Sequence, residues 1–136
     1  MNAEQKTMNE SGTMSGQREK PRDLKARLRE HSLRIIRMFG ALPRDMVAQV
    51  LGKQVLRSGT SPGAHHREAS RARSDAEFIS KMEGGLQELE ETAYWLELLV
   101  ESGIVPQEKM QELINETEEL IAIFVSSAKT VKAKKR

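Results

Sequence analysis

Residues 74–102, SDAEFISKMEGGLQELEETAYWLELLVES, carry the strongest structural signal of the chain. Ser74 followed three residues later by Glu77 has the form of a capping box, with Ser74 as the N-cap and Glu77 reaching back to its amide. Apolar residues then alternate at intervals of three and four, which indicates a heptad seam made of Ile79, Met82, Leu86, Leu89, Ala93, Leu96 and Val100. The stretch predicts one helix from Asp75 to about Ser102, roughly 40 Å long.

A further helix is predicted downstream of this stretch. Gly103 suits the C-cap of the preceding helix, and Pro106 suits the first turn of the next one. The same spacing then predicts a buried face made of Met110, Leu113, Thr117, Leu120, Phe124 and Ala128.

Two amphipathic segments are predicted upstream. A first helix of about 18 to 20 residues starts near Asp23 and is stopped by Pro43. Its apolar face contains Leu24, Leu28, Ile35, Phe39 and Leu42, with Ile36 beside it. A second helix begins near Arg44 or Asp45, and its predicted apolar side contains Met46, Val47, Val50, Leu51 and Val55.

The sequence does not decide whether the second helix continues through residues 57–64, RSGTSPGA. Local rules assign this segment to a loop. Small residues at near-helical spacing also let two helices approach closely, and a buried helix with one Pro can kink rather than end. Residues 64–73 are helical again in pattern, so the segment is either a kink in one long helix or a break between two.

Four amphipathic segments with short links, and no strand-like alternation, predict an all-α fold, an antiparallel up-down four-helix bundle with long second and third helices. Right-angle packing of a broken second helix is the alternative. The expected organisation is a polar, disordered N-terminal tail over residues 1–21, the bundle over 22–131 and a basic tail over 132–136.

Composition excludes several classes of protein. The 136 residues contain no Cys, which rules out a disulfide scaffold, a thiolate metal site and a catalytic thiol. No apolar run approaches the ~20 residues that span a bilayer, and the N-terminal residues lack the apolar core of a secretory signal. We therefore expect a soluble cytoplasmic protein without a membrane partner.

The formal net charge of +2 is the balance of strongly opposed segments. Residues 22–73 hold twelve Lys and Arg against four acids, residues 83–119 hold eleven Glu against one Lys, and residues 120–136 hold five Lys and Arg and no acid. Such an asymmetry bears on partners rather than on the fold.

The sequence contains no phosphate-binding loop, dinucleotide-binding fingerprint, zinc-protease motif or nucleophile elbow. His65, His66 and Glu68 could in principle bind a metal or move a proton. Adjacent His residues on a helix point about 100° apart, however, so that the pair cannot share one metal, and a surface or interface role is favoured. We expect no enzymatic activity, no catalytic residue, no cofactor and no metal.

The candidate nucleic-acid-binding residues are the cationic and histidine side chains in the middle of the chain: Arg57, His65, His66, Arg67, Arg71 and Arg73. Arginine is expected where phosphate is held, and such a patch would bind with strong salt dependence. The alternative is that arginines of the first two helices pair with glutamates of the last two, within one subunit or between subunits. The Lys-rich residues 129–136 are compatible with a phosphate-binding arm and equally with a solubilising tail.

Two neighbouring aromatic residues, Tyr94 and Trp95, lie on the predicted third helix. Few other aromatics surround them in the sequence, so packing in the core or at an oligomer interface is favoured over base stacking.

The chain from about Asp23 to Lys132 resembles the bacterial four-helix bundle family also called the 23S rRNA intervening-sequence protein, or S23-type, family. The blocks that carry the resemblance are residues 56–64 (LRSGTSPGA), 67–69 (REA), 71–74 (RARS), 76–79 (AEFI) and 94–99 (YWLELL). Two features depart from the family pattern. His65-His66 stands where an Asn-Tyr type pair is common, and residues 1–20 extend the usual start.

The resemblance implies a second helix that continues through the Ser-Gly-Thr-Ser segment, and an assembly of five bundles into a homopentameric barrel. A related branch is the accessory protein of diversity-generating retroelements, which implies RNA or DNA and a reverse transcriptase as partners. The leading hypothesis is a non-enzymatic oligomer that binds nucleic acid or a nucleoprotein through the candidate arginines. The competing hypothesis is a structural scaffold without a nucleic-acid partner.

Overall fold

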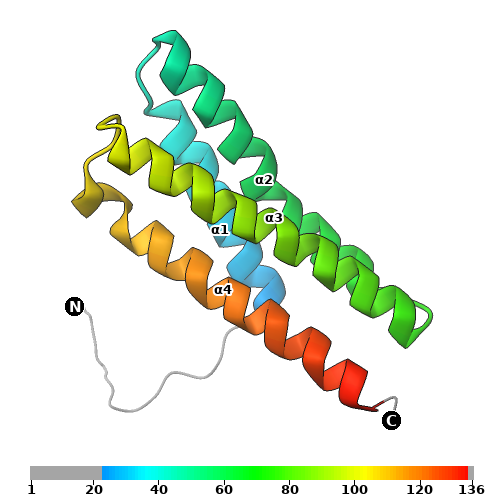
Figure 1. Cartoon of the computed structure of the whole chain (residues 1–136). Coiled ribbons are helices and arrows are strands. Elements are labelled where there is room, and N and C mark those ends of the chain that lie inside the picture. Colours follow the sequence, from blue (N-terminus) through cyan, green and yellow to red (C-terminus); the bar gives the residue numbers. More distant parts are fainter. Residues whose placement is uncertain (1–22, 135–136) are drawn as a thin grey trace.

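The computed structural model describes residues 23–134, which form four α-helices joined by short links (Figure 1). Their bounds are α1 (Leu24–Gly40), α2 (Met46–Ser70), α3 (Asp75–Glu101) and α4 (Gln107–Lys134). Successive helices run in opposite directions, and ion pairs of Arg27 with Glu116 and of Arg34 with Glu112 join α1 to α4 in antiparallel order. The predicted all-α, antiparallel four-helix bundle is therefore confirmed.

The described residues cover only part of the predicted chain organisation. The polar tail predicted for residues 1–21 lies outside them. At the other end, α4 continues to Lys134, into the segment that the sequence assigned to a basic tail. None of the helices described here is long and apolar enough to cross a membrane.

Side chains at the helix starts satisfy backbone N–H groups that the helices leave without partners. Asp45 Oδ1 accepts a hydrogen bond from the amide of Ala48, and Ser74 Oγ accepts one from the amide of Glu77, both at 3.0 Å. The predicted N-cap at Ser74 is confirmed, but the Glu77 carboxylate accepts from the amide of Arg73 instead of that of Ser74. After α3, Gly103 adopts φ +82°, the left-handed conformation that glycine tolerates best.

The second helix is continuous through Pro62, so a break at residues 57–64 is ruled out. Proline has no N–H and normally disrupts the turn before it. Here hydroxyl groups supply hydrogen bonds to that turn, since Thr60 Oγ1 donates to the Leu56 carbonyl at 2.8 Å and Ser61 Oγ donates to the Arg57 carbonyl at 2.7 Å. The carbonyl left without its usual partner is that of Ser58, and the segment remains helical because Ser58, Gly59 and Pro62 are buried against the neighbouring helices.

Glycines on α2 let α1 approach it closely. A Cβ atom at Gly59 would lie 2.9 Å from Ile35 Cγ1, and one at Gly52 would lie 2.8 Å from Phe39 Cδ1. Both distances are shorter than ordinary carbon contacts, so α1 can pack this near only where α2 lacks a side chain.

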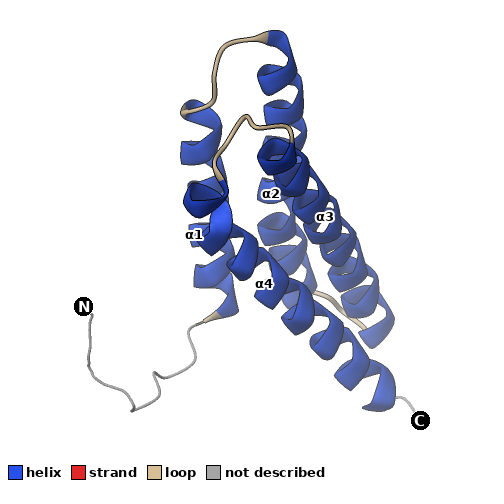
Figure 2. Cartoon of the chain, turned by 60° about the vertical axis from the view of Figure 1, so that its left-hand side comes forward, coloured by secondary structure: helices blue, strands red, loops and turns tan. Residues whose placement is uncertain are grey.

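The core consists of two clusters of apolar side chains along the bundle. One cluster contains Ile35, Leu42, Val55, Leu96, Leu99, Met110 and Leu113. The other contains Leu28, Ala69, Met82, Leu89, Leu120 and Phe124. With 17 residues α1 is the shortest of the four helices. Figure 2 shows that α4 diverges from α1, so that the two helices are farthest apart at the C-terminal end of α4.

The buried face of α4 is the predicted one, but the predicted seam of α3 is partly wrong. The residues of α3 that are buried are Met82, Gly85, Leu89, Thr92, Leu96 and Leu99. Three of the seven predicted positions are thus displaced by one residue, because α3 packs Gly85, Thr92 and Leu99 toward its neighbours. Leu86, Ala93 and Val100 lie at the flank and are only partly buried.

The predicted apolar side of α2 is also wrong at its start. Met46, Val47 and Val50 are 79%, 60% and 55% exposed. Val55 was predicted on the apolar side and is buried. The other residues that face the core in this part of α2 are Ala48 and Gly52, since small residues allow the close contact with α1.

Candidate nucleic-acid interface

Arg57 does not present an unpaired cation, because two carboxylates of α3 hold it. Its Nη1 lies 3.1 Å from Glu88 Oε1 and its Nη2 lies 2.6 Å from Glu91 Oε2. The hydrogen bond from Arg57 lowers the pKa of Glu91, and a second one from Trp95 Nε1 has the same effect. The same pairing raises the pKa of Arg57 above its ordinary value. Its charge is thus neutralised within the bundle.

His65 and His66 serve mainly as packing groups. The His65 ring lies against α3, where a Cβ atom at Gly84 would be 2.9 Å from His65 Cε1. The His66 ring lies 6.5 Å from the Phe124 ring, centroid to centroid. Burial lowers the pKa of His66, so it is uncharged at neutral pH. Neither Nδ1 atom has a hydrogen-bond partner among the described residues.

Arg67, Arg71 and Arg73 at the C-terminal end of α2 are exposed, and no carboxylate of residues 23–134 forms an ion pair with them. Arg67 lines a depression of about 250 Å³ together with Lys25 and Arg29 from the start of α1. Three cations from two helices therefore surround one small hollow, whose wall also includes Asp23.

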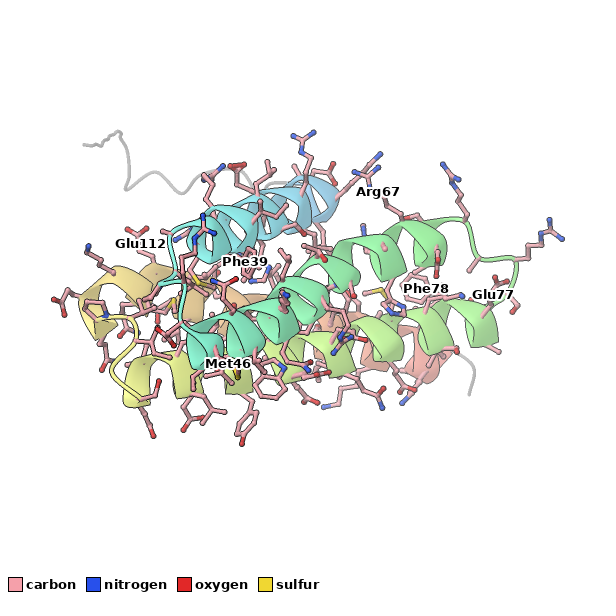
Figure 3. All side chains as sticks on the ribbon, turned by 90° about the horizontal axis from the view of Figure 1, so that it is seen from above. Phe39, Met46, Arg67, Glu77, Phe78 and Glu112 are labelled. Atoms are coloured by element: carbon pink, nitrogen blue, oxygen red, sulfur yellow. The ribbon has the colours of Figure 1, made fainter. Side chains whose placement is uncertain are left out.

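Arg73 lies beside the end of α4, because Arg73 and Lys134 line the same shallow depression of about 430 Å³. One end of the bundle thus gathers cations from three helices. We call this surface the basic end and define it as Lys25, Arg29, Arg67, Arg71, Arg73 and Lys134. Figure 3 shows Arg67 and Glu77 toward this end, and Met46 and Glu112 toward the other.

Most acidic groups near the basic end have partners of their own. Asp23 caps α1 by accepting from the amide of Lys25, and Glu77 accepts from the amide of Arg73. Glu68 Oε1 lies 3.2 Å from Lys81 Nζ, and Asp75 is exposed in the first turn of α3. The guanidinium groups of the basic end are consequently available to an external anion.

The pairing of arginines with glutamates within one subunit, which the sequence left open, occurs at other places. Arg27 forms a two-point contact with Glu116, with Nη2 to Oε1 at 2.7 Å, and also reaches Glu119 at 2.8 Å. Lys132 Nζ lies 2.7 Å from Glu83 Oε2. Part of the basic surplus of the first two helices is therefore balanced internally, and the cations of the basic end are among those that are not.

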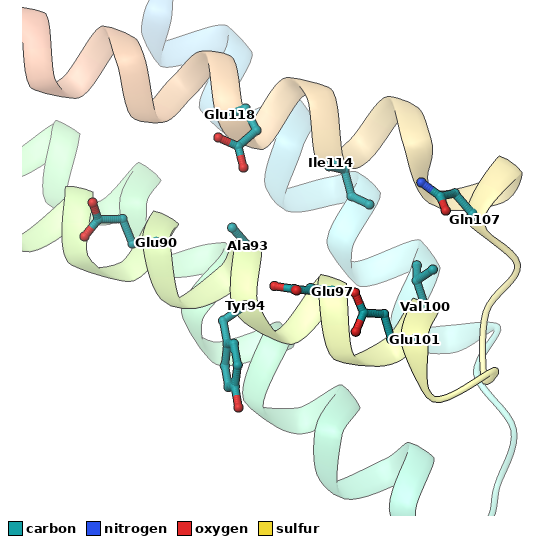
Figure 4. A pocket seen from close by; sticks show the side chains of 9 residues that line it. All are labelled: Glu90, Ala93, Tyr94, Glu97, Val100, Glu101, Gln107, Ile114 and Glu118. Carbon is teal, nitrogen blue, oxygen red and sulfur yellow. The ribbon is translucent and has the colours of Figure 1, made fainter.

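Tyr94 and Trp95 occupy different environments although their rings are only 5.2 Å apart. Trp95 is half-buried against the core and donates to Glu91 on its own helix. Tyr94 is 53% exposed and stands at the rim of a groove between α3 and α4 (Figure 4). The structure thus places Trp95 in the bundle and only Tyr94 on an outer surface.

Lys25 and Arg29 are contributors to the basic end that sequence reasoning missed. Both lie about 40 residues before Arg67, so that only the antiparallel packing of α1 on α2 brings them together. The sequence indicated a basic surface only through the excess of Lys and Arg over residues 22–73. This excess does not show which of the cations lie close together in the fold.

The protein is thus an all-α four-helix bundle with short links between its helices, and unpaired cations gather at one of its ends. The family model described as 23S rRNA-intervening sequence protein matches residues 23–126, and the chain belongs to this family. A crystal structure of a protein of unknown function from the S23 ribosomal protein family of Bacteroides thetaiotaomicron is similar, with 37% identity and a TM-score of 0.74. The match covers 79% of this chain and 99% of that one. The comparison with curated proteins finds no match.

Proposed function

We propose that the protein is a non-enzymatic, homo-oligomeric accessory protein of the cytoplasm that binds nucleic acid through its basic end. The observation that carries this proposal is the exposure of Arg67, Arg71 and Arg73 without ion pairs among residues 23–134. Guanidinium groups at such a surface match the phosphates of a nucleic-acid backbone, which they bind by charge and geometry.

Cations from separate helices favour an extended polyanion over a single small ligand. The depression beside Arg67 and the one beside Arg73 lie on different sides of the C-terminal part of α2, and each is lined by a second helix. A chain of phosphates can occupy both, whereas one small anion occupies only one. Contacts to phosphate carry no sequence information, so we expect binding through these cations with little sequence preference.

The non-enzymatic part of the proposal is supported by the two histidines. His65 and His66 were the candidates for proton transfer or metal binding, and both rings pack against neighbouring helices. The oligomeric part is supported by large apolar side chains on the outer surface of α1, Leu33 and Ile36. A pentamer is what the family resemblance implies.

Binding of a fluorescently labelled structured RNA at two salt concentrations tests the proposal. We expect affinity to fall steeply as salt rises, because each phosphate contact releases about 0.7 to 0.9 counterions. The variant Arg67→Gln/Arg71→Gln/Arg73→Gln is expected to lose affinity and to reduce the slope of log affinity against log salt by about 2 to 3.

The matched control is Arg44→Gln/Lys53→Gln/Lys109→Gln, which removes the same number of exposed cations away from the basic end. This control is expected to change affinity and salt slope much less. Weak affinity that does not rise on lowering the salt would contradict nucleic-acid binding, and equal losses in both variants would contradict the basic end as its site.

The scaffold alternative predicts a different response. Light scattering of the protein alone at rising salt separates subunits joined by charge, which dissociate, from subunits joined by apolar burial, which persist. An oligomer that forms in full but binds no RNA at low salt would favour the scaffold over our proposal.

A further inference from the structure

The groove between α3 and α4 combines an apolar floor with an acidic rim. Its volume is about 450 Å³, and Ala93, Val100 and Ile114 lie between carboxylates (Figure 4). Glu90 and Glu118 flank one end of this floor, and Glu97 and Glu101 lie toward the other. None of these four carboxylates forms an ion pair within residues 23–134, so the groove offers unpaired negative charge around partly buried apolar groups.

The outer surface of α1 has the complementary composition. Arg29, Leu33, Ile36 and Arg37 follow one another at intervals of four, three and one, so they share one side of the helix. Leu33 is 39% exposed and Ile36 is 47% exposed, so both present apolar surface between the two arginines. We call these four residues the α1 stripe. Arg37 has only a loose contact with Glu30, at 4.0 Å.

We propose that the α1 stripe of a second copy of this chain docks in the groove between α3 and α4. This proposal rests on the homo-oligomer of the proposed function and specifies how its subunits meet. In this contact Leu33 and Ile36 cover the floor, and Arg29 and Arg37 meet the acidic rim. Arg29 is then held between subunits, and the remaining cations of the basic end stay available to nucleic acid. The occupant is a second copy because the same chain carries both an unpaired acidic groove and an exposed basic and apolar stripe that fits it.

The dimensions of the two surfaces agree. Arg29 and Arg37 are eight residues apart, which on an α-helix is about 12 Å. Along α3, Glu97 lies about 10 Å and Glu101 about 16 Å from Glu90 by the same measure. An arginine at each end of the stripe can therefore reach a carboxylate at each end of the groove, which is the helix-in-groove mode of recognition.

The two surfaces lie on different helices of one subunit, so the contact joins unlike patches. Such a heterologous contact leaves one stripe and one groove unused in every dimer, and a further copy can add at each side until a ring closes. A two-fold dimer, in contrast, would use the same patch twice.

Light scattering of charge-reversed variants tests the contact. Arg29→Glu/Arg37→Glu and Glu97→Lys/Glu101→Lys are each expected to lower the oligomer mass and to raise the concentration needed for assembly by at least about tenfold. An equimolar mixture of the two variants is expected to recover association between unlike variants, since each reversed surface then finds an opposite charge. A ring with an odd number of subunits keeps one contact between like variants, so species smaller than the wild-type ring are expected as well. Thermal unfolding followed by circular dichroism verifies that each variant is folded.

Two control variants make the result specific. Ser80→Lys/Gln87→Lys/Glu108→Lys makes the same change in net charge as the groove variant but at exposed sites outside the groove, and it is expected to leave the mass unchanged. Met46→Ser/Val50→Ser alters the apolar surface of α2 and is expected to have little effect.

The outcomes separate this contact from the proposed function. An oligomer that survives both charge reversals, or that dissociates in Met46→Ser/Val50→Ser alone, would overturn the contact and leave the homo-oligomer intact. Failure of the mixture to recover association between unlike variants would overturn it as well. A wild-type chain that stays monomeric at all concentrations would overturn the homo-oligomer, and the contact with it.

Discussion

His31 is a fully buried polar residue that the apolar pattern of the sequence did not single out. It lies between Leu28 and Ile35 on the inner side of α1, and its Nε2 is 2.8 Å from Thr117 Oγ1 on α4. The Thr117 hydroxyl donates to the Leu113 carbonyl at 2.8 Å, so it accepts the proton of His31 Nε2. A neutral imidazole therefore links α1 to α4 inside the core.

The free energy of unfolding is expected to decrease as the pH falls from about 7 to 4. Burial lowers the pKa of His31 from 6.5 to about 4, with Glu116 opposing and Arg34 adding to the effect. Between these two values the unfolded chain binds a proton that the folded chain excludes, and at about 1.4 kcal/mol per pKa unit the decrease is on the order of 3 kcal/mol. His66, whose pKa is also lowered by burial, acts in the same direction.

Urea unfolding of the wild type and of His31→Gln at pH 7 and pH 4.5 measures this contribution. Glutamine keeps a donor for Thr117 but does not titrate, so the variant is expected to lose less stability between the two pH values. Equal losses in both proteins would show that His31 is not the group responsible.

At the scale of the helices, the distance between α1 and α2 is set by missing side chains. Gly59→Ala is expected to lower the free energy of unfolding by about 1–3 kcal/mol, because the added methyl group would lie within 2.9–3.0 Å of three carbons of the buried Ile35. Gly63→Ala, one turn further along, meets Leu28 Cβ only at 3.8 Å. It is expected to raise stability by up to about 1 kcal/mol through helix propensity.

Chemical denaturation of the two alanine variants measures this difference. Both changes replace glycine by alanine inside α2, so their helix propensity is matched and only the contact with α1 differs. A stabilised Gly59→Ala protein would mean that α1 can move away from α2 at little cost.

The sequence predicted α4 correctly and α2 poorly, and the reason lies in what each helix packs against. Every residue predicted to be buried in α4 is apolar or Thr and faces the core. In α2 the inner positions are Ala48, Gly52, Ser58, Gly59 and Pro62, which apolar periodicity does not recognise. Met46, Val47 and Val50 were predicted to be inside because they are larger, but large side chains cannot enter so close a helix contact.

Apolar periodicity also failed to find the buried small and polar residues of α3, which is why part of its predicted seam is displaced by one residue. Thr92 is buried because its hydroxyl meets that of Ser58 at 2.8 Å and donates to the Glu88 carbonyl. Gly85 is buried because Phe124 needs the space of its missing side chain. The members of the basic end could likewise not be predicted without the fold. Arg57 is excluded because it pairs with Glu88 on α3, and Lys25 is included because α1 packs beside the end of α2.

At the scale of the whole molecule, the ion pairs that join α1 to α4 differ strongly in burial. We therefore expect them to contribute differently to the free energy of unfolding. Arg27 and Glu116 side chains are 17% and 18% exposed, whereas the Glu112 side chain that pairs with Arg34 is 91% exposed. Arg27→Met is expected to destabilise the protein by about 1–3 kcal/mol, because it leaves a partly buried carboxylate without a partner. Arg34→Met is expected to change stability by less than about 1 kcal/mol.

Urea denaturation midpoints of the two methionine variants check this order. Methionine retains much of the apolar stem of arginine, so the comparison isolates the charge. The Arg27 pair is also expected to resist added salt better than the Arg34 pair, because burial limits screening. Similar losses in both variants would contradict the assigned role of burial.

The up-down order of the helices has a further consequence for the basic end. The chain enters α1 beside Arg67 and leaves α4 beside Arg73, so both entry and exit lie next to the same cations. Residues before 23 and after 134 include Arg18, Lys20, Arg22, Lys135 and Arg136. Since these residues are covalently joined to the two ends of the bundle, the proposed nucleic-acid partner would meet them at an effective concentration set by the length of chain between them and not by the concentration of the protein.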